Sequence, residues 1–121
     1  MKLLTSILII FVALEHFYFL VLEMFLWTTP KVIKIFGLKD KSFAEETKIL
    51  AANQGLYNGF LVAGLIYSLV IDATNFSIFF LACVSIAGLY GAYSTKKIRL
   101  FYIQSVPALL ALCSIILHNS L

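Results

Sequence analysis

Four long apolar runs constrain the fold of this 121-residue chain more than any other feature. They cover about residues 3–26, 49–71, 76–95 and 98–118. Each run is close to the roughly 20 residues with which an α-helix crosses about 30 Å of hydrocarbon. The runs are continuous rather than alternating, which excludes a membrane β-barrel. We therefore predict an all-α integral membrane four-helix bundle, formed as a single transmembrane domain over residues 1–121.

The composition agrees with a membrane location. Hydrophobic residues make up 62% of the chain and charged residues 12%, and the mean hydropathy is +1.01. A soluble domain of this length needs far more polar surface than this. We expect the lipid bilayer to be the main partner and expect no nucleic-acid partner. The first run continues to Trp27 without a small-residue cleavage site, so we predict a retained helix rather than a signal peptide.

The basic residues are strongly biased toward two connections. Membrane proteins retain Lys- and Arg-rich loops in the cytoplasm. With four spans, the two basic connections share one side, so both termini are expected outside. We predict a multi-pass protein of the plasma membrane in this orientation. The eight basic residues of these connections are Lys31, Lys34, Lys39, Lys41, Lys48, Lys96, Lys97 and Arg99.

The first connection carries signals for a short helix of its own. Thr29 is placed as an N-cap, and Pro30 suits the first helical position. Apolar residues interleave with lysines, as in amphipathic helices that lie at the headgroup level. Gly37 should end this helix. We therefore predict a short amphipathic interfacial helix between the first two membrane helices.

A capping box predicts where the second membrane helix begins. Ser42 and Glu45 have the spacing with which an N-cap hydroxyl and an N3 carboxylate satisfy each other's backbone groups. The helix is then expected to start near Phe43 and to continue unbroken into the membrane.

Small residues and one proline predict how the helices pack. Pro107 should kink the last span or free a carbonyl there. Cys83 and Cys113 are expected to behave as small apolar residues, with an interhelical disulfide as a less favoured alternative. Ridges of small residues let helices approach closely and also offer a surface for homo-oligomers. The two predicted ridges are Ala51, Gly55, Gly59 and Ala63 on the second span, and Cys83, Ala87 and Gly91 on the third.

The first span contains Glu15, His16 and Glu23, which are costly in hydrocarbon. At about 100° per residue, His16 and Glu23 lie about 20° apart around the helix, and Glu15 lies about 80° from Glu23. One side of the helix therefore carries all three. Glu15 and His16 fall near the middle of the span, and Glu23 lies about two turns closer to the basic side.

Polar residues of other spans fall at matching depths. They could hydrogen-bond the carboxyl groups, either as structural glue or as the lining of a binding site. We expect ligand-binding or proton-carrying roles to be favoured for Glu15 and His16, and packing roles for individual carboxamides. The candidate partners of the first helix are Asn53, Gln54, Tyr57, Asn58 and Gln104.

Three blocks, "ALEHFYFLVLEMFLW", "FAEETKILAANQGLYNGFLVAG" and "QSVPALLAL", carry a family resemblance. The chain resembles the domain-of-unknown-function 1304 family of small bacterial membrane proteins over nearly its whole length. This resemblance implies four membrane helices. It also implies that the polar positions of the first two blocks are typical of the family, and it assigns no activity.

Three functions remain open from the sequence. The favoured hypothesis is the binding or transport of a small lipophilic or amphipathic molecule, with proton coupling through Glu15 and His16. The layout is similar to that of small multidrug resistance transporters, but the long basic connection departs from them. The alternatives are a membrane enzyme that moves a proton on a lipid or isoprenoid, and a structural or accessory subunit.

No catalytic motif settles the enzyme question. Glu15 and His16 point about 100° apart on one helix, which is unsuited to a shared metal. We expect no metal site and no cofactor.

Overall fold

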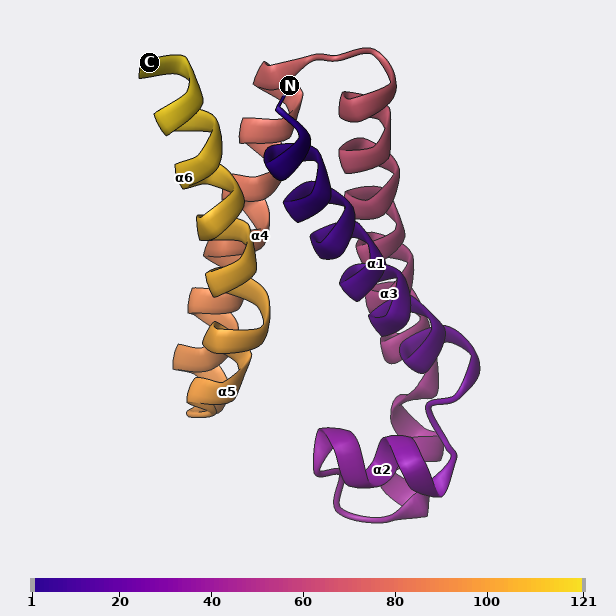
Figure 1. Ribbon diagram of the computed structural model, residues 1–121. Coiled ribbons are helices and arrows are strands. Elements are labelled where there is room, and N and C mark those ends of the chain that lie inside the picture. The colour runs from indigo at the N-terminus through magenta and orange to yellow at the C-terminus, as the bar shows by residue number, and fades with distance from the viewer. Residues whose placement is uncertain (1, 121) are drawn as a thin grey trace. The chain divides into compact units, whose positions relative to one another are not determined.

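The computed structural model describes residues 2–120, which form helices and no strand (Figure 1). This confirms the predicted all-α fold. In chain order the elements are α1 (Leu3–Phe25), α2 (Pro30–Phe36), α3 (Lys41–Val70), α4 (Thr74–Thr95), α5 (Ile98–Leu100), the π-helical turn η1 (Phe101–Ser105) and α6 (Val106–Ser120).

Four helices are long and apolar enough to cross a membrane, as predicted. They are α1, α3, α4 and the continuous helical stretch Ile98–Asn119. Only 17–28% of the most apolar part of each helix is buried inside the chain. Most of their apolar surface therefore needs another cover, which lipid provides in a multi-pass membrane protein.

The chain forms two compact units. We call residues 15–62 the α2 unit, because it contains α2 with the adjoining parts of α1 and α3. The described residues 2–14 and 63–120 form the α4–α6 unit, in which α4 and α6 lie side by side (Figure 1).

The α2 helix forms as the sequence predicts. The Thr29 hydroxyl accepts a hydrogen bond from the Val32 amide at 3.4 Å, and Pro30 occupies the first helical position. Gly37 ends the helix with a φ of 64°, a left-handed conformation that glycine adopts without strain. Val32 is fully buried.

The start of α3 differs from the predicted capping box. The helix begins at Lys41, and Oδ1 of Asp40 accepts a hydrogen bond from the Phe43 amide at 2.8 Å. Asp40 is thus the cap in place of Ser42, and Glu45 forms an ion pair with Lys48 at 3.1 Å. Aspartate is as effective a cap as serine, so the earlier position gains two residues of helix.

Pro107 is the second residue of α6 and directly follows a change in helix type. The Val106 amide donates to the Phe101 carbonyl across five residues, which defines η1. Proline has no amide hydrogen and crowds the carbonyl four residues before it, so a widened turn accommodates it. The Ser105 hydroxyl, on the same turn, donates to the Ser85 carbonyl of α4 at 2.8 Å.

The small-residue ridge predicted on α4 is displaced. Ala87 is exposed, and a Cβ added at Gly91 would meet only Leu100 Cδ1 at an ordinary 3.7 Å. The close approach occurs at Gly88, where a Cβ would lie 2.9 Å from Cβ of Gln104. The buried face of α4 is Ser77, Leu81, Val84, Gly88 and Ala92.

Hydroxyl groups join the helices of the α4–α6 unit. Thr5 of α1 and Ser114 of α6 share a hydrogen bond between their hydroxyl groups. The Ser77 hydroxyl of α4 donates to the Ser68 hydroxyl of α3 at 2.8 Å, with both residues fully buried. Such pairs satisfy polar groups where no water is available. Both Cys83 and Cys113 are free thiols, so the less favoured disulfide is absent.

Candidate functional site

The polar residues predicted on the first span all lie on α1, within the α2 unit. His16 is 1% exposed and Glu23 is 8% exposed. Glu15 is half-buried. The α1 helix therefore turns its ionisable side chains away from its exposed surface, which consists of large apolar residues such as Leu14 and Phe17.

Glu23 is held by α3. The Asn58 Nδ2 group donates a hydrogen bond to Oε1 of Glu23 at 2.6 Å. In a medium of low polarity such a bond is stronger than in water, and loss of the donor would leave a buried acceptor unmatched. This pair joins α1 to α3 across the α2 unit.

A glycine brings the two helices close enough for this bond. A Cβ added at Gly55 would lie 3.2 Å from Cβ of Glu23 and 3.3 Å from the Leu20 carbonyl oxygen. At Gly59, a Cβ would lie 2.9 Å from Cδ1 of Leu20. The predicted ridge on the second span therefore makes a close contact through these two glycines and buried Ala51, whereas Ala63 is exposed.

Glu15 contrasts with Glu23. Its Oε1 atom is buried and has no hydrogen-bond partner among residues 2–120. A buried acceptor without a donor is destabilising by about 1–3 kcal/mol. His16, the next residue, packs its ring edge-on against Phe19, with ring centroids 5.3 Å apart. Glu15 therefore presents an acceptor that can take a hydrogen bond from a bound group.

The other predicted site residues do not share this environment. Asn53, Gln54 and Tyr57 lie on the exposed surface of α3, and the Tyr57 ring packs near Phe60, 6.1 Å between centroids. Gln104 is half-buried on η1, in the α4–α6 unit, against Gly88. Of the predicted partners, Asn58 is the one that bonds to a carboxyl group of α1.

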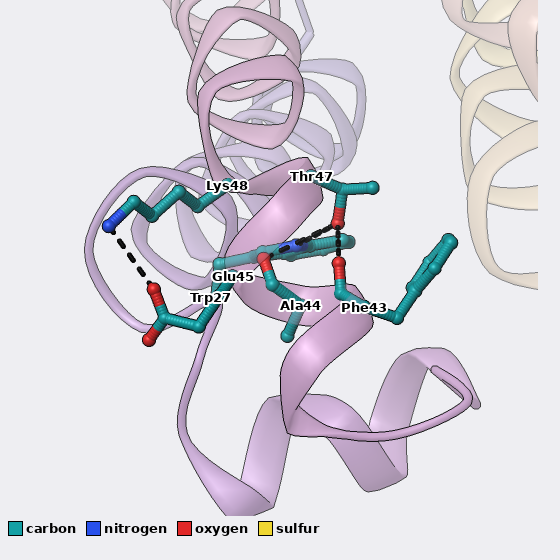
Figure 2. Close-up of polar contacts among 6 residues, drawn as sticks. All are labelled: Trp27, Phe43, Ala44, Glu45, Thr47 and Lys48. Carbon is teal, nitrogen blue, oxygen red and sulfur yellow. Dashed lines mark hydrogen bonds and ion pairs between the residues drawn. The ribbon is translucent and has the colours of Figure 1, made fainter.

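Sequence reasoning missed the contact that ties the turn after α1 to the base of α3. The indole Nε1 of Trp27 donates to the Thr47 hydroxyl at 3.0 Å, and that hydroxyl donates to the Phe43 carbonyl at 2.8 Å (Figure 2). The Trp27 ring also packs against Phe36 of α2, 5.0 Å between centroids. A tryptophan N–H predicts that some acceptor is present, but the sequence did not identify Thr47.

A small polar pocket lies elsewhere, in the α4–α6 unit. Its volume is about 110 Å³, enough for a few water molecules. Asp72, with a φ of 51°, belongs to the turn between α3 and α4 beside it. Within the part of the chain that the structure describes, no three metal-ligating side chains gather. The pocket is lined by Thr5, Asp72, Thr74, Ile115, His118 and Asn119.

Comparison with known proteins identifies the family. A family model described as a protein of unknown function (DUF1304) matches residues 10–116. The chain belongs to this family. It is also similar to the uncharacterised protein YpaA of Lactococcus lactis subsp. lactis (strain IL1403), with 33% identity over 117 residues that cover 94% of this chain and 98% of YpaA. No solved structure matches the chain.

Family membership confirms the resemblance carried by the three sequence blocks. The description of the DUF1304 family names no activity. The chemistry of the site therefore depends on what its own residues can do, above all Glu15 and Glu23.

Proposed function

We propose that this protein binds and transports a small lipophilic or amphipathic molecule, which donates a hydrogen bond to Glu15 inside the bilayer. The supporting observation is Oε1 of Glu15, buried without a partner among the described residues. An apolar side chain would pack α1 at less cost, so a carboxyl group at this position calls for a functional reason. A ligand hydroxyl or ammonium group supplies the missing donor.

The proposal assigns a second role to the neighbouring imidazole. His16 is buried beside Glu15 in the chain, and imidazole is the side chain best suited to exchange a proton near neutral pH. A proton moves to or from this pair when the ligand enters or leaves. Transport is then coupled to protons.

The orientation of the chain is part of the same proposal. The connection between α1 and α3 contains Lys31, Lys34 and Lys39, and the first two turns of α3 add Lys41 and Lys48. The turn after α4 contains Lys96 and Lys97, and α5 adds Arg99. With α1, α3, α4 and α6 all crossing the plasma membrane, both connections face the cytoplasm and both termini face outward. Glu23 then lies on the cytoplasmic side of Glu15.

A structural role has a specific observation in its favour, but for Glu23 alone. Its bond to Asn58 and the close approach at Gly55 are features of a helix contact. Glu23 thus fixes α1 against α3, while Glu15 remains open to a ligand. The two carboxyl groups therefore have separable roles.

Mass spectrometry of the full chain in lipid nanodiscs tests the proposal. The wild-type protein should carry a co-purifying small molecule that Glu15→Leu loses. Since a hydrogen bond to a charged group is worth about 1.5–3 kcal/mol, retention should fall roughly 10- to 100-fold. Glu45→Gln is the matched control, because Glu45 is exposed near the start of α3, and it should retain the molecule.

Two outcomes would overturn the proposal. One is a wild-type protein that carries no small molecule from its native membrane. The other is a Glu15→Leu protein that retains the molecule as well as Glu45→Gln does. A molecule that is chemically altered by the wild type but not by His16→Gln would instead support the enzyme alternative.

A further inference from the structure

We propose that α2 and its flanking lysines form a binding surface for the anionic headgroups of bilayer lipids. We call Lys31, Lys34, Lys39 and Lys41 the α2 platform. All four side chains are exposed and lie within 11 residues of one another. The proposal concerns the lipid phosphate groups that surround the protein, and it stands independently of the ligand proposed for Glu15.

Apolar and basic residues lie on different sides of α2. Val32 is fully buried, and at 100° per residue Phe36 lies about 40° from it. Lys31 and Lys34 lie about 60° from each other, at about 100° and 160° from Val32. Such a short helix has one apolar face held by the protein and one cationic face, an arrangement typical of interfacial helices.

Contacts with the turn after α1, which is itself bonded to α3, hold α2 in place. The Thr29 hydroxyl donates to the Leu26 carbonyl at 2.6 Å, which fixes the turn out of α1. Trp27 packs on Phe36 of α2 and donates to Thr47 of α3. After Gly37 the Leu38 amide donates to the Ile33 carbonyl at 2.9 Å, which closes the helix. Because α2 is held at both ends, the backbone that carries its lysines is ordered before headgroups bind.

Lys31 shows where the platform meets the lipid. Its ammonium group lies 5.8 Å from the centre of the Tyr18 ring on α1. Tyr18 is exposed, 46%, so the cation lies along the outer surface of the helix. A lipid headgroup beside α1 can reach this ammonium group along the exposed face of the helix.

The acidic residues of the segment offset only part of the charge of the platform, because Asp40 and Glu46 bring two negative charges against its four lysines. Asp40 is engaged in capping α3 through the Phe43 amide. Glu45 pairs with Lys48, which is therefore not counted in the platform. Each lysine near an anionic membrane surface favours binding about fivefold, so charge complementarity selects anionic over neutral lipids.

The single tryptophan of the chain supplies the measurement. Trp27 packs against α2, so quenching of its fluorescence reports which lipids lie near the platform. The full chain is reconstituted with brominated phosphatidylglycerol in phosphatidylcholine, and in parallel with brominated phosphatidylcholine in phosphatidylglycerol. The wild type should prefer phosphatidylglycerol at least about 25-fold, the product of two lysines at about fivefold each, and the preference should disappear at high salt.

Two double substitutions test which lysines cause the preference for phosphatidylglycerol. Lys31→Gln with Lys34→Gln should reduce the preference for phosphatidylglycerol by roughly tenfold or more. Lys96→Gln with Lys97→Gln removes the same charge from the turn after α4 and should leave it unchanged. Circular dichroism confirms that each protein is folded. If the first pair does not fold, the salt titration of the wild type decides the question.

Three results would overturn the proposal. The first is equal quenching of wild-type Trp27 by the two lipids. The second is a preference that both lysine pairs reduce equally, which would indicate net charge rather than a local surface. The third is a preference that persists at high salt.

Discussion

Asn58 of α3 donates a hydrogen bond to Glu23 of α1 at 2.6 Å, directly beside the point where Gly55 lets the two helices touch. The close contact brings the two side chains within hydrogen-bond distance. A side chain at position 55 would push the helices apart, and loss of Asn58 would leave the buried Glu23 without the donor that α3 supplies. The carboxyl group of Glu23 is therefore part of the packing of the α2 unit.

Asn58→Leu should lower the stability of the protein in detergent. The change leaves a buried acceptor of Glu23 without its donor, which destabilises by about 1–3 kcal/mol. Thermal unfolding followed by circular dichroism measures the effect. Glu23→Gln is the control, because its amide oxygen can still accept the bond from Asn58. Equal melting temperatures for wild type and Asn58→Leu would show that the bond contributes nothing to stability.

Gly55→Ala should destabilise, whereas Gly91→Ala should not. The added methyl group at 55 meets Met24, Glu23 and the Leu20 carbonyl, and such overpacking costs about 1–3 kcal/mol. At 91 the methyl group meets Leu100 at 3.7 Å, and helix propensity alone then favours alanine by about 0.5–1 kcal/mol. Opposite shifts in melting temperature are expected. Shifts of the same sign and size would contradict the close contact at Gly55.

Thr47→Val should change the surroundings of Trp27 with little effect on the helix itself. The substitution keeps the shape of the side chain and removes the acceptor of the indole N–H. We expect a loss of about 0.5–1.5 kcal/mol in unfolding free energy and a shift in tryptophan emission. Thr95→Val is a control, since its hydroxyl donates to the Gly91 carbonyl of its own helix, far from Trp27 in the sequence. An unchanged emission spectrum would remove Thr47 as the indole partner.

Cysteine labelling tests the proposed orientation. In a background without Cys83 and Cys113, Lys39→Cys should react with a membrane-impermeant maleimide only from the cytoplasmic side. Asn119→Cys should react from the opposite side, because an odd number of spans separates the two positions. Labelling of Asn119→Cys from the cytoplasm would contradict the orientation inferred from the lysine bias.

The sequence predicted the helices well because their signals are local. Apolar length predicted the four spans, and Thr29, Pro30 and Gly37 predicted α2 with both of its ends. The start of α3 was misplaced because Asp40 and Ser42 are both good caps, and the apolar pattern further along does not decide between them. Where two capping residues of equal strength lie within one turn, the sequence does not determine at which of them the helix begins.

The contacts between helices were predicted less completely. Matching depths along the spans predicted Asn58 as a partner of α1, together with Asn53, Gln54 and Tyr57. Depth does not determine which face of α3 meets α1. That depends on Gly55 and Gly59, whose spacing was recognised as a ridge. On α4 the same reasoning chose Ala87 and Gly91, whereas the widened turn before Pro107 brings Gly88 against Ser105. A π-helical turn shifts the register in a way that a period of 3.6 residues does not anticipate.

The central claim is that a bound molecule donates a hydrogen bond to Glu15, and infrared difference spectroscopy tests it most directly. Spectra of the protein in nanodiscs are recorded before and after detergent extraction of bound small molecules, and Glu15→Gln identifies the Glu15 carboxyl band. We predict that this band shifts when the molecules are removed and returns when the extract is added back, while the Glu23 band stays fixed by Asn58. A Glu15 band that is the same in all three states would contradict the claim.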